Sequence, residues 1–141
     1  MRHLLENAKY GEIPLDLMYK MAEGVPYLGV YQDPASAQDT IVDPENLPVA
    51  ADEEIPVAWN CSGPSGEMAK MITDKKFRSR GFGKLLTVTL ARRQAALLGF
   101  IPHVFVEADN LASKVMFDNL PGWSMTHKSI MLRKCQPQEC V

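Results

Sequence analysis

The chain has 141 residues, of which 46 % are apolar and 23 % are charged, and its formal net charge is −2 at pH 7. This length and composition are typical of one globular domain, and no apolar run approaches the roughly 18 residues of a membrane span. Because the sequence pI is about 5.9, we do not expect general nucleic-acid binding, and the lack of a long apolar run predicts no membrane partner.

The N-terminal stretch "MRHLLENAKYGEIPLD" has no long apolar core and soon carries acidic residues. It matches neither a signal peptide nor a transit peptide, so we expect an intracellular protein of the cytoplasm or the mitochondrion. Cys61, Cys135 and Cys140 lack zinc-ligand spacing, which predicts free thiols in a reducing compartment, with a Cys135–Cys140 bridge as the alternative. The three histidines are scattered, so no metal site is predicted.

The first third of the chain predicts a helix, a strand and an insertion. "PLDLMYKMAEG" has apolar residues at roughly helical spacing and stops at Gly24, and "VPYLGVY" follows as a strand over 25–31. Residues 32–54 hold seven acidic residues, three prolines and no basic residue. We interpret this stretch as a solvated surface insertion with a short strand at Thr40–Val42; an acidic lid is the functional alternative.

A hairpin is predicted next. "EIPVAWNCS" (54–62) has the composition of a strand, "SGPSG" that of a turn, and "GEMAKMITD" (66–74) that of the partner strand. The two-residue period of a strand places four side chains on one face of the second strand. These are Glu67, Ala69, Met71 and Thr73.

The second half of the chain alternates helices and strands. A helix is predicted from Gly81 to Leu98, with Leu86, Leu90 and Leu97 on one side and Gly99 at its end. "PHVFVEAD" is predicted as a buried strand, and "NLASKVMFDNL" as a helix with Asn110 as its N-cap.

The C-terminal part is predicted to be extended over "WSMTHKSIMLRK" and to end in a polar tail over 135–141. The element order is therefore β–β–β–helix–β–helix–β, with a helix in front. Residues 67–107 should form a right-handed crossover between parallel strands.

The turn between the hairpin and the long helix concentrates positive charge. Half of the ten residues over 75–84 are basic and none is acidic: Lys75, Lys76, Arg78, Arg80 and Lys84. A helix N-terminus attracts phosphate, glycines allow close approach of a ligand, and basic side chains add attraction. The pattern R-x-x-G-x-G thus predicts a phosphate site, with a solvated basic turn as the alternative. No G-x-G-x-x-G or G-K-[ST] is present, which argues against dehydrogenase and kinase loops.

These motifs resemble those of the GNAT superfamily of acyl-CoA-dependent N-acyltransferases. R-x-x-G-x-G after a strand is similar to the pyrophosphate loop of that superfamily, and "NLASKVMFDNLPGW" (110–123) to its later signature. "IPVAWNCSGPSGEMAKMITDKKFRSRG" resembles the C-terminal domain of glycine N-acyltransferases and their relatives. The resemblance is strong over 55–123 and weaker over 15–31.

The resemblance implies an α/β GNAT fold over residues 1–141, with a mixed sheet, flanking helices and splayed central parallel strands at 67–73 and 103–108. Acyl-CoA or acetyl-CoA would enter between these strands as co-substrate. Its pantetheine would pair with the backbone of Met71, Ile72 and Thr73. Its pyrophosphate would lie on the loop made of Arg78, Ser79, Arg80, Gly81, Phe82, Gly83 and Lys84. Asn110, Ser113 and Phe117 match positions near the pantetheine and the thiol.

The resemblance also implies a reaction, in which the amine of a small acceptor such as glycine or another amino acid attacks the thioester directly in a ternary complex, without a metal. Glu67 matches the glutamate to which the family assigns the role of base, and Glu107 is the next candidate. Phe117 stands where many members have a tyrosine that protonates the leaving thiolate. The alternative is an acyl-CoA-binding or regulatory domain without turnover, and a homodimer in which a partner chain completes the sheet stays open.

Overall fold

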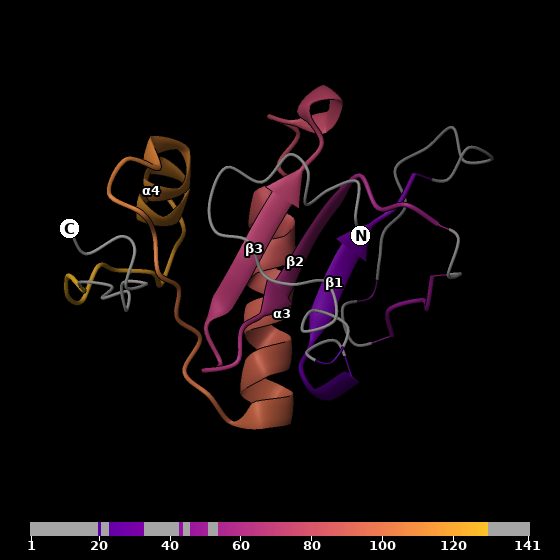
Figure 1. Ribbon diagram of the computed structural model, residues 1–141, viewed down its shortest axis with the longest axis horizontal. Coiled ribbons are helices and arrows are strands. Elements are labelled where there is room, and N and C mark those ends of the chain that lie inside the picture. The colour runs from indigo at the N-terminus through magenta and orange to yellow at the C-terminus, as the bar shows by residue number, and fades with distance from the viewer. Residues whose placement is uncertain (1–19, 21–22, 33–42, 44–45, 51–53, 130–141) are drawn as a thin grey trace, which may run out of the picture. The chain divides into compact units, whose positions relative to one another are not determined.

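The computed structural model describes residues 20, 23–32, 43, 46–50 and 54–129. Within this part the chain divides into two compact units, which meet in sequence between Phe105 and Val106. The elements are β1 (Tyr27–Val30), β2 (Ala58–Ser62), β3 (Met68–Thr73), the 3-10 turn η1 (Lys75–Phe77), α3 (Phe82–Leu98) and α4 (Leu111–Asp118) (Figure 1). No helix among the described residues is long and apolar enough to cross a membrane.

The first unit contains an antiparallel sheet in the order β1-β2-β3. Tyr27 lies opposite Cys61 and Val30 opposite Ala58, and β2 pairs with β3 on its other side. The central strand is buried along its whole length, as expected for a strand with neighbours on both edges. The three predicted strands and the hairpin are confirmed.

Helix α3 packs across one face of this sheet and contacts all three strands (Figure 1). Leu86 and Leu90 are 2 % and 0 % exposed, so the predicted helix and its apolar side are confirmed there. Leu97 is 64 % exposed. Gln94 already bonds the hairpin turn at Gly66, so Leu97, one helical turn further along, lies near the end of the sheet, and this prediction is wrong for its side chain.

A β-bulge interrupts the β2–β3 ladder. Trp59 lies opposite Ile72 but Cys61 opposite Ala69, so Asn60 faces two residues, Lys70 and Met71. Lys70 has a φ of 48°, the left-handed conformation that inserts an extra residue into a strand.

The bulge overturns the expected common face of Glu67, Ala69, Met71 and Thr73. Ser62, which Gln94 of α3 contacts, lies opposite Met68, so Ala69 in the next pair points away from the helix. Met71 points toward the helix, because its Sδ accepts a hydrogen bond from Thr87 Oγ1 of α3 at 3.5 Å. The extra residue shifts the alternation by one position.

The strand predicted over 102–109 is not formed. A single parallel bridge joins Met68 to Val104, with Met68 N donating to His103 O at 2.8 Å, and the rest of the described segment is irregular. Phe105 is 55 % exposed. A strand forms only where several of its residues pair with a neighbouring strand. Here a single bridge is present, so the predicted pair of parallel strands is wrong except at this bridge.

In the second unit, α4 confirms the predicted helix and its cap. Asn110 Oδ1 accepts a hydrogen bond from Ser113 N at 3.2 Å. The helix is followed by Leu120, which is 6 % exposed, and by Gly122 in the left-handed conformation. Residues 123–129 contain no regular element.

Several predictions fall partly or wholly outside the described residues. In the predicted N-terminal helix, Lys20, Glu23 and Gly24 are described and are helical. The short strand at Thr40–Val42 and the tail over 135–141 lie outside the described residues.

Candidate active site

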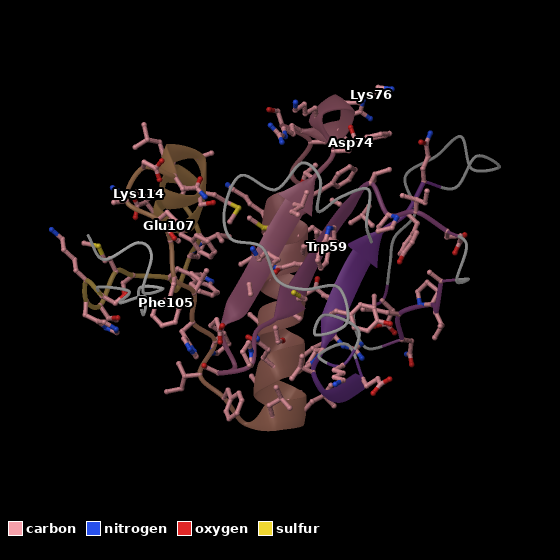
Figure 2. The ribbon with its side chains drawn as sticks, in the orientation of Figure 1. Trp59, Asp74, Lys76, Phe105, Glu107 and Lys114 are labelled. Atoms are coloured by element: carbon pink, nitrogen blue, oxygen red, sulfur yellow. The ribbon has the colours of Figure 1, made fainter. Side chains whose placement is uncertain are left out.

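The basic loop, residues 74–84, leaves the end of β3 and enters α3. Asp74 anchors its first part: Asp74 Oδ1 accepts from Lys76 N at 2.9 Å, which caps η1, and Asp74 N donates to Val57 O at 2.8 Å. Figure 2 shows Asp74 and Lys76 beyond the tip of β3. Asp74 is a site residue that was not predicted, although an aspartate just before a helical turn is a capping signal.

Two of the arginines have local contacts that hold them in the loop. Arg78 Nε donates to Thr73 O, the last carbonyl of β3, at 3.1 Å. The Arg80 guanidinium lies over the Phe77 ring, 5.2 Å from its centroid, a cation–π distance. Among the described residues, none of the five basic side chains of the loop has a carboxylate as an ion-pair partner. Over the described part of the chain, the loop therefore keeps an excess of positive charge.

The N-terminus of α3 has no side-chain cap. The first bond of the helix runs from Leu85 N to Gly81 O at 3.0 Å, so the N–H groups of Phe82, Gly83 and Lys84 precede the hydrogen-bonded ladder. They carry the positive end of the helix dipole. The result is a set of donors and cations suited to a phosphate.

Gly81 makes this arrangement possible through its backbone. Its φ is 85° and its ψ is −2°, a conformation that costs other residues about 1 kcal/mol or more. A Cβ at Gly81 would meet no atom within 4 Å, so the conformation rather than the available space requires glycine here. Ser79, with a φ of 61°, has the same handedness without being glycine.

Glu67 lies at the other end of β3 from the basic loop, in the residue that precedes the strand. Its Oε2 accepts from Ser65 N at 3.0 Å, and its carbonyl accepts from Gly63 N at 2.7 Å. The carboxylate folds over the turn and packs against Gly63, where a Cβ would overlap it. The side chain is half-buried, so the carboxylate is oriented and still reachable by solvent.

Next to this turn, Cys61 and Lys70 lie close enough to influence each other's charge. Burial raises the pKa of the Cys61 thiol to about 11, although the Lys70 ammonium opposes this. Burial lowers the pKa of Lys70. The thiol is free, as predicted, and it is protonated at neutral pH, which makes it a poor nucleophile.

The other predicted site residues belong to the second unit. Asn110 and Ser113 meet in the cap of α4, and the Phe117 ring packs on Trp123 with centroids 5.0 Å apart. Glu107, whose side chain is exposed, accepts a backbone bond from Asn110 N at 3.0 Å. Each of these residues therefore has a local structural role in its own unit.

The structure thus brings together the C-terminal half of β3, the loop that follows it and the first residues of α3, which include ten of the predicted ligand positions. These are Met71, Ile72, Thr73, Arg78, Ser79, Arg80, Gly81, Phe82, Gly83 and Lys84. Over the part of the chain that is described, no group of three or more His, Cys, Asp or Glu is placed to hold a metal.

A comparison with models of protein families gives a match over the same elements. The family model described as FR47-like protein matches residues 51–130, more than half of the chain, including β2, β3, the basic loop, α3 and α4. A search of curated proteins found no match. The matched segment contains the uncapped helix N-terminus and the basic residues before it, and members of this kind of family use acetyl-CoA or acyl-CoA. The chain belongs to the FR47-like family, a family of GNAT-type acetyltransferases.

Proposed function

We propose that the protein transfers an acyl group from acyl-CoA or acetyl-CoA to the amine of a small acceptor, such as glycine or another amino acid. The observation that carries this proposal is the uncapped N-terminus of α3, which ends a loop of five basic residues that have no carboxylate ion-pair partner among the described residues. The resemblance to glycine N-acyltransferases supports the choice of acceptor.

In this proposal the pyrophosphate of CoA lies on the N–H groups of the segment from Arg78 to Lys84. The bond from Arg78 Nε to Thr73 O joins that loop to the end of β3. From there the pantetheine runs along the edge of β3 and pairs with the backbone at Met71–Thr73. That edge has a single bridge, at Met68, among the described residues.

The reaction needs a base, because an amino acid's ammonium group cannot attack until it loses a proton. Glu67 accepts that proton, the free amine attacks the thioester carbonyl, and N–H groups of β3 stabilise the oxyanion. A C–N bond forms, the C–S bond breaks, CoA leaves as the thiolate, and the second proton that the nitrogen loses goes to that thiolate or to solvent. The bond from Ser65 N holds Oε2, and Oε1, which packs against Gly63, is the oxygen that would meet the amine.

The test follows free-thiol release with acetyl-CoA, longer acyl-CoAs and a panel of amino acids. We expect release that depends on the acceptor. Glu67→Gln keeps the size of the side chain but cannot take a proton, so turnover should fall by about 10²–10⁴-fold while the Kd of CoA stays the same. Glu23→Gln, at an exposed residue of the same charge, is the matched control and should keep wild-type turnover.

Raising the pH should partly rescue Glu67→Gln, because solvent then deprotonates more of the amine. Tight CoA binding without thiol release for any acyl-CoA and acceptor pair would show a CoA-binding domain without turnover. The absence of a hydroxyl at Phe117, whose ring packs on Trp123, is the feature that favours this second function.

A further inference from the structure

Gln94 is a polar residue on the buried side of α3. It follows Leu86 and Leu90 at successive helical turns, and its exposure is 0 %. Burial of an amide is unfavourable unless its groups are hydrogen-bonded, and among the described residues Gln94 Oε1 has no such partner, so the bonds of Nε2 are what hold the side chain. Gln94 Nε2 donates to Ser62 Oγ at 2.9 Å and to Gly66 O at 3.1 Å. The long helix is therefore bonded to the turn between β2 and β3.

Gly66, the last residue of that turn, makes two hydrogen bonds and contacts an aromatic ring. Its carbonyl accepts from Gln94, and its N–H donates to Gly63 O at 3.0 Å. The nearest atoms of the Phe100 ring are 2.7 Å from the position that a Cβ of residue 66 would occupy. Gly66 also has a φ of +83°, so its conformation favours glycine, and an added Cβ would have to displace the Phe100 ring.

The carbonyl that Gln94 binds belongs to the peptide unit between Gly66 and Glu67. Because a peptide unit is rigid and planar, the direction of its C=O also sets the position of the Glu67 backbone nitrogen and Cα. The side chain of Glu67 starts from that Cα, and its Oε2 then meets Ser65 N at 3.0 Å. The bond from Gln94 thus acts on the direction of the Glu67 carboxylate through one peptide plane.

We propose that Gln94 is a positioning residue for Glu67, which holds the turn over residues 63–66 so that the carboxylate meets the acceptor amine. The proposal rests on the function proposed above, in which Glu67 is the base. Gln94 itself contacts no reacting group. Its removal should lower the rate of proton transfer and leave CoA binding intact, since the basic loop lies at the other end of α3.

Ser62 provides a matched control from the same buried network. Its Oγ accepts from Gln94 and donates to Pro26 O at 2.9 Å. Ser62→Ala therefore removes two hydrogen bonds, as Gln94→Met does, but leaves the bond from Gln94 to Gly66 in place. Both variants should be less stable than the wild type, and only Gln94→Met should affect the direction of Glu67.

The experiment measures kcat, the Kd of CoA and the melting temperature of the full chain for Gln94→Met, Ser62→Ala, Glu67→Gln and the double variant. We expect Gln94→Met to lower kcat by about tenfold or more with an unchanged Kd, and Ser62→Ala to keep wild-type kcat. In the Glu67→Gln background, Gln94→Met should change kcat by less than about twofold, because both changes act on one group. Gln94→Asn, one methylene too short to reach Gly66 O, replaces Gln94→Met if that variant does not fold.

A loss of kcat that adds fully to that of Glu67→Gln, or an equal loss in Ser62→Ala, overturns the proposal. A second readout is independent of activity: native-state amide exchange at Ser65 and Gly66 should become at least about tenfold faster in Gln94→Met than in Ser62→Ala. Unchanged exchange also overturns it. Wild-type turnover in Glu67→Gln would instead refute the assigned base, and the exchange rates would still decide whether Gln94 holds the turn.

Discussion

At the scale of single residues, the turn before β3 shows why position 63 is glycine. The Glu67 carboxylate occupies the space in which a Cβ of residue 63 would stand. The backbone of Gly63 meanwhile donates to Glu67 O and accepts from Gly66 N. Any larger residue here must push the carboxylate away or distort these bonds.

Gly63→Ala should therefore damage the reaction without damaging CoA binding. If Glu67 is the base, the displaced carboxylate should lower kcat by about tenfold or more, and the Kd of CoA should not change. Gly24→Ala is the matched control, because Gly24 is helical and an added Cβ meets no atom within 4 Å. Steady-state thiol release and calorimetry check both values, and wild-type kcat for Gly63→Ala would contradict the expectation.

Lys70 is a residue-scale feature with no signal in the sequence. Its φ of 48° is a backbone conformation that glycine and asparagine adopt more often than other residues. A lysine within a strand pattern therefore does not indicate a bulge. Gln94 is another such residue, since its place on the helix suggests an apolar side chain. By contrast, Asn110 was predicted as a cap and is one, because capping depends on its immediate neighbours alone.

At the scale of the elements, the bulge in β3 makes a prediction about stability. Lys70→Gly and Lys70→Val both remove the lysine side chain, but a β-branched residue in the left-handed conformation is strained. Lys70→Val should be less stable than Lys70→Gly by about 1–2 kcal/mol, measured by urea unfolding. The same two changes at Lys76, which does not have a positive φ, serve as control and should differ by less than about 0.5 kcal/mol.

The charge of the basic loop leads to a prediction about CoA binding. Arg78→Glu removes the bond to Thr73 O and places a negative charge beside the phosphate, so CoA binding should weaken by at least about 2 kcal/mol. The loss should shrink as salt is added, because exposed charges are screened. Arg92→Glu, an exposed arginine in the middle of α3, is the control. Calorimetry at low salt that gives equal affinities for Arg78→Glu and the wild type would show that the loop is only solvated surface.

Elements whose ends are marked by nearby residues such as glycine were predictable from the sequence. Strands that depend on pairing with a segment far away in the sequence were not. The glycine-rich turn marked the hairpin, and Gly81 and Gly99 marked the ends of α3, where both have left-handed backbones. The pattern of "PHVFVEAD" is that of a strand, yet it forms one bridge to β3. Whether such a segment becomes a strand depends on a partner far away in sequence, which its own residues do not encode.

At the scale of the whole molecule, the buried Cys61 thiol makes stability depend on pH. Its pKa is raised from 9.0 to about 11 in the folded chain, so folding favours the neutral thiol. This contribution, about 2–3 kcal/mol at 1.36 kcal/mol per pKa unit, is fully present below pH 9 and is lost as the pH rises through 11. Wild-type protein should therefore lose stability over this range.

Cys61→Ala isolates the effect. The difference in unfolding free energy between wild type and Cys61→Ala should fall by about 2 kcal/mol between pH 8 and pH 11. Tyr31, whose pKa is raised by burial, titrates nearby, but it is present in both proteins and cancels in the difference. A difference that stays constant across this range would mean that the thiol is not desolvated.

The length of helix α3 also sets the separation between the basic loop and the turn that carries Glu67. It begins at the basic loop, which is bonded to the end of β3 through Arg78, and it ends beside the turn that carries Glu67, where Gln94 and Phe100 contact Gly66. Seventeen residues of α-helix extend over about 25 Å, and a packed helix does not stretch. If CoA binds as proposed, α3 therefore fixes the distance between the phosphate site and the Glu67 carboxylate, and the distance from phosphate to thioester becomes a criterion for recognition. Under that proposal, nucleotide fragments would occupy only the end at the basic loop, even where their charge matches the loop.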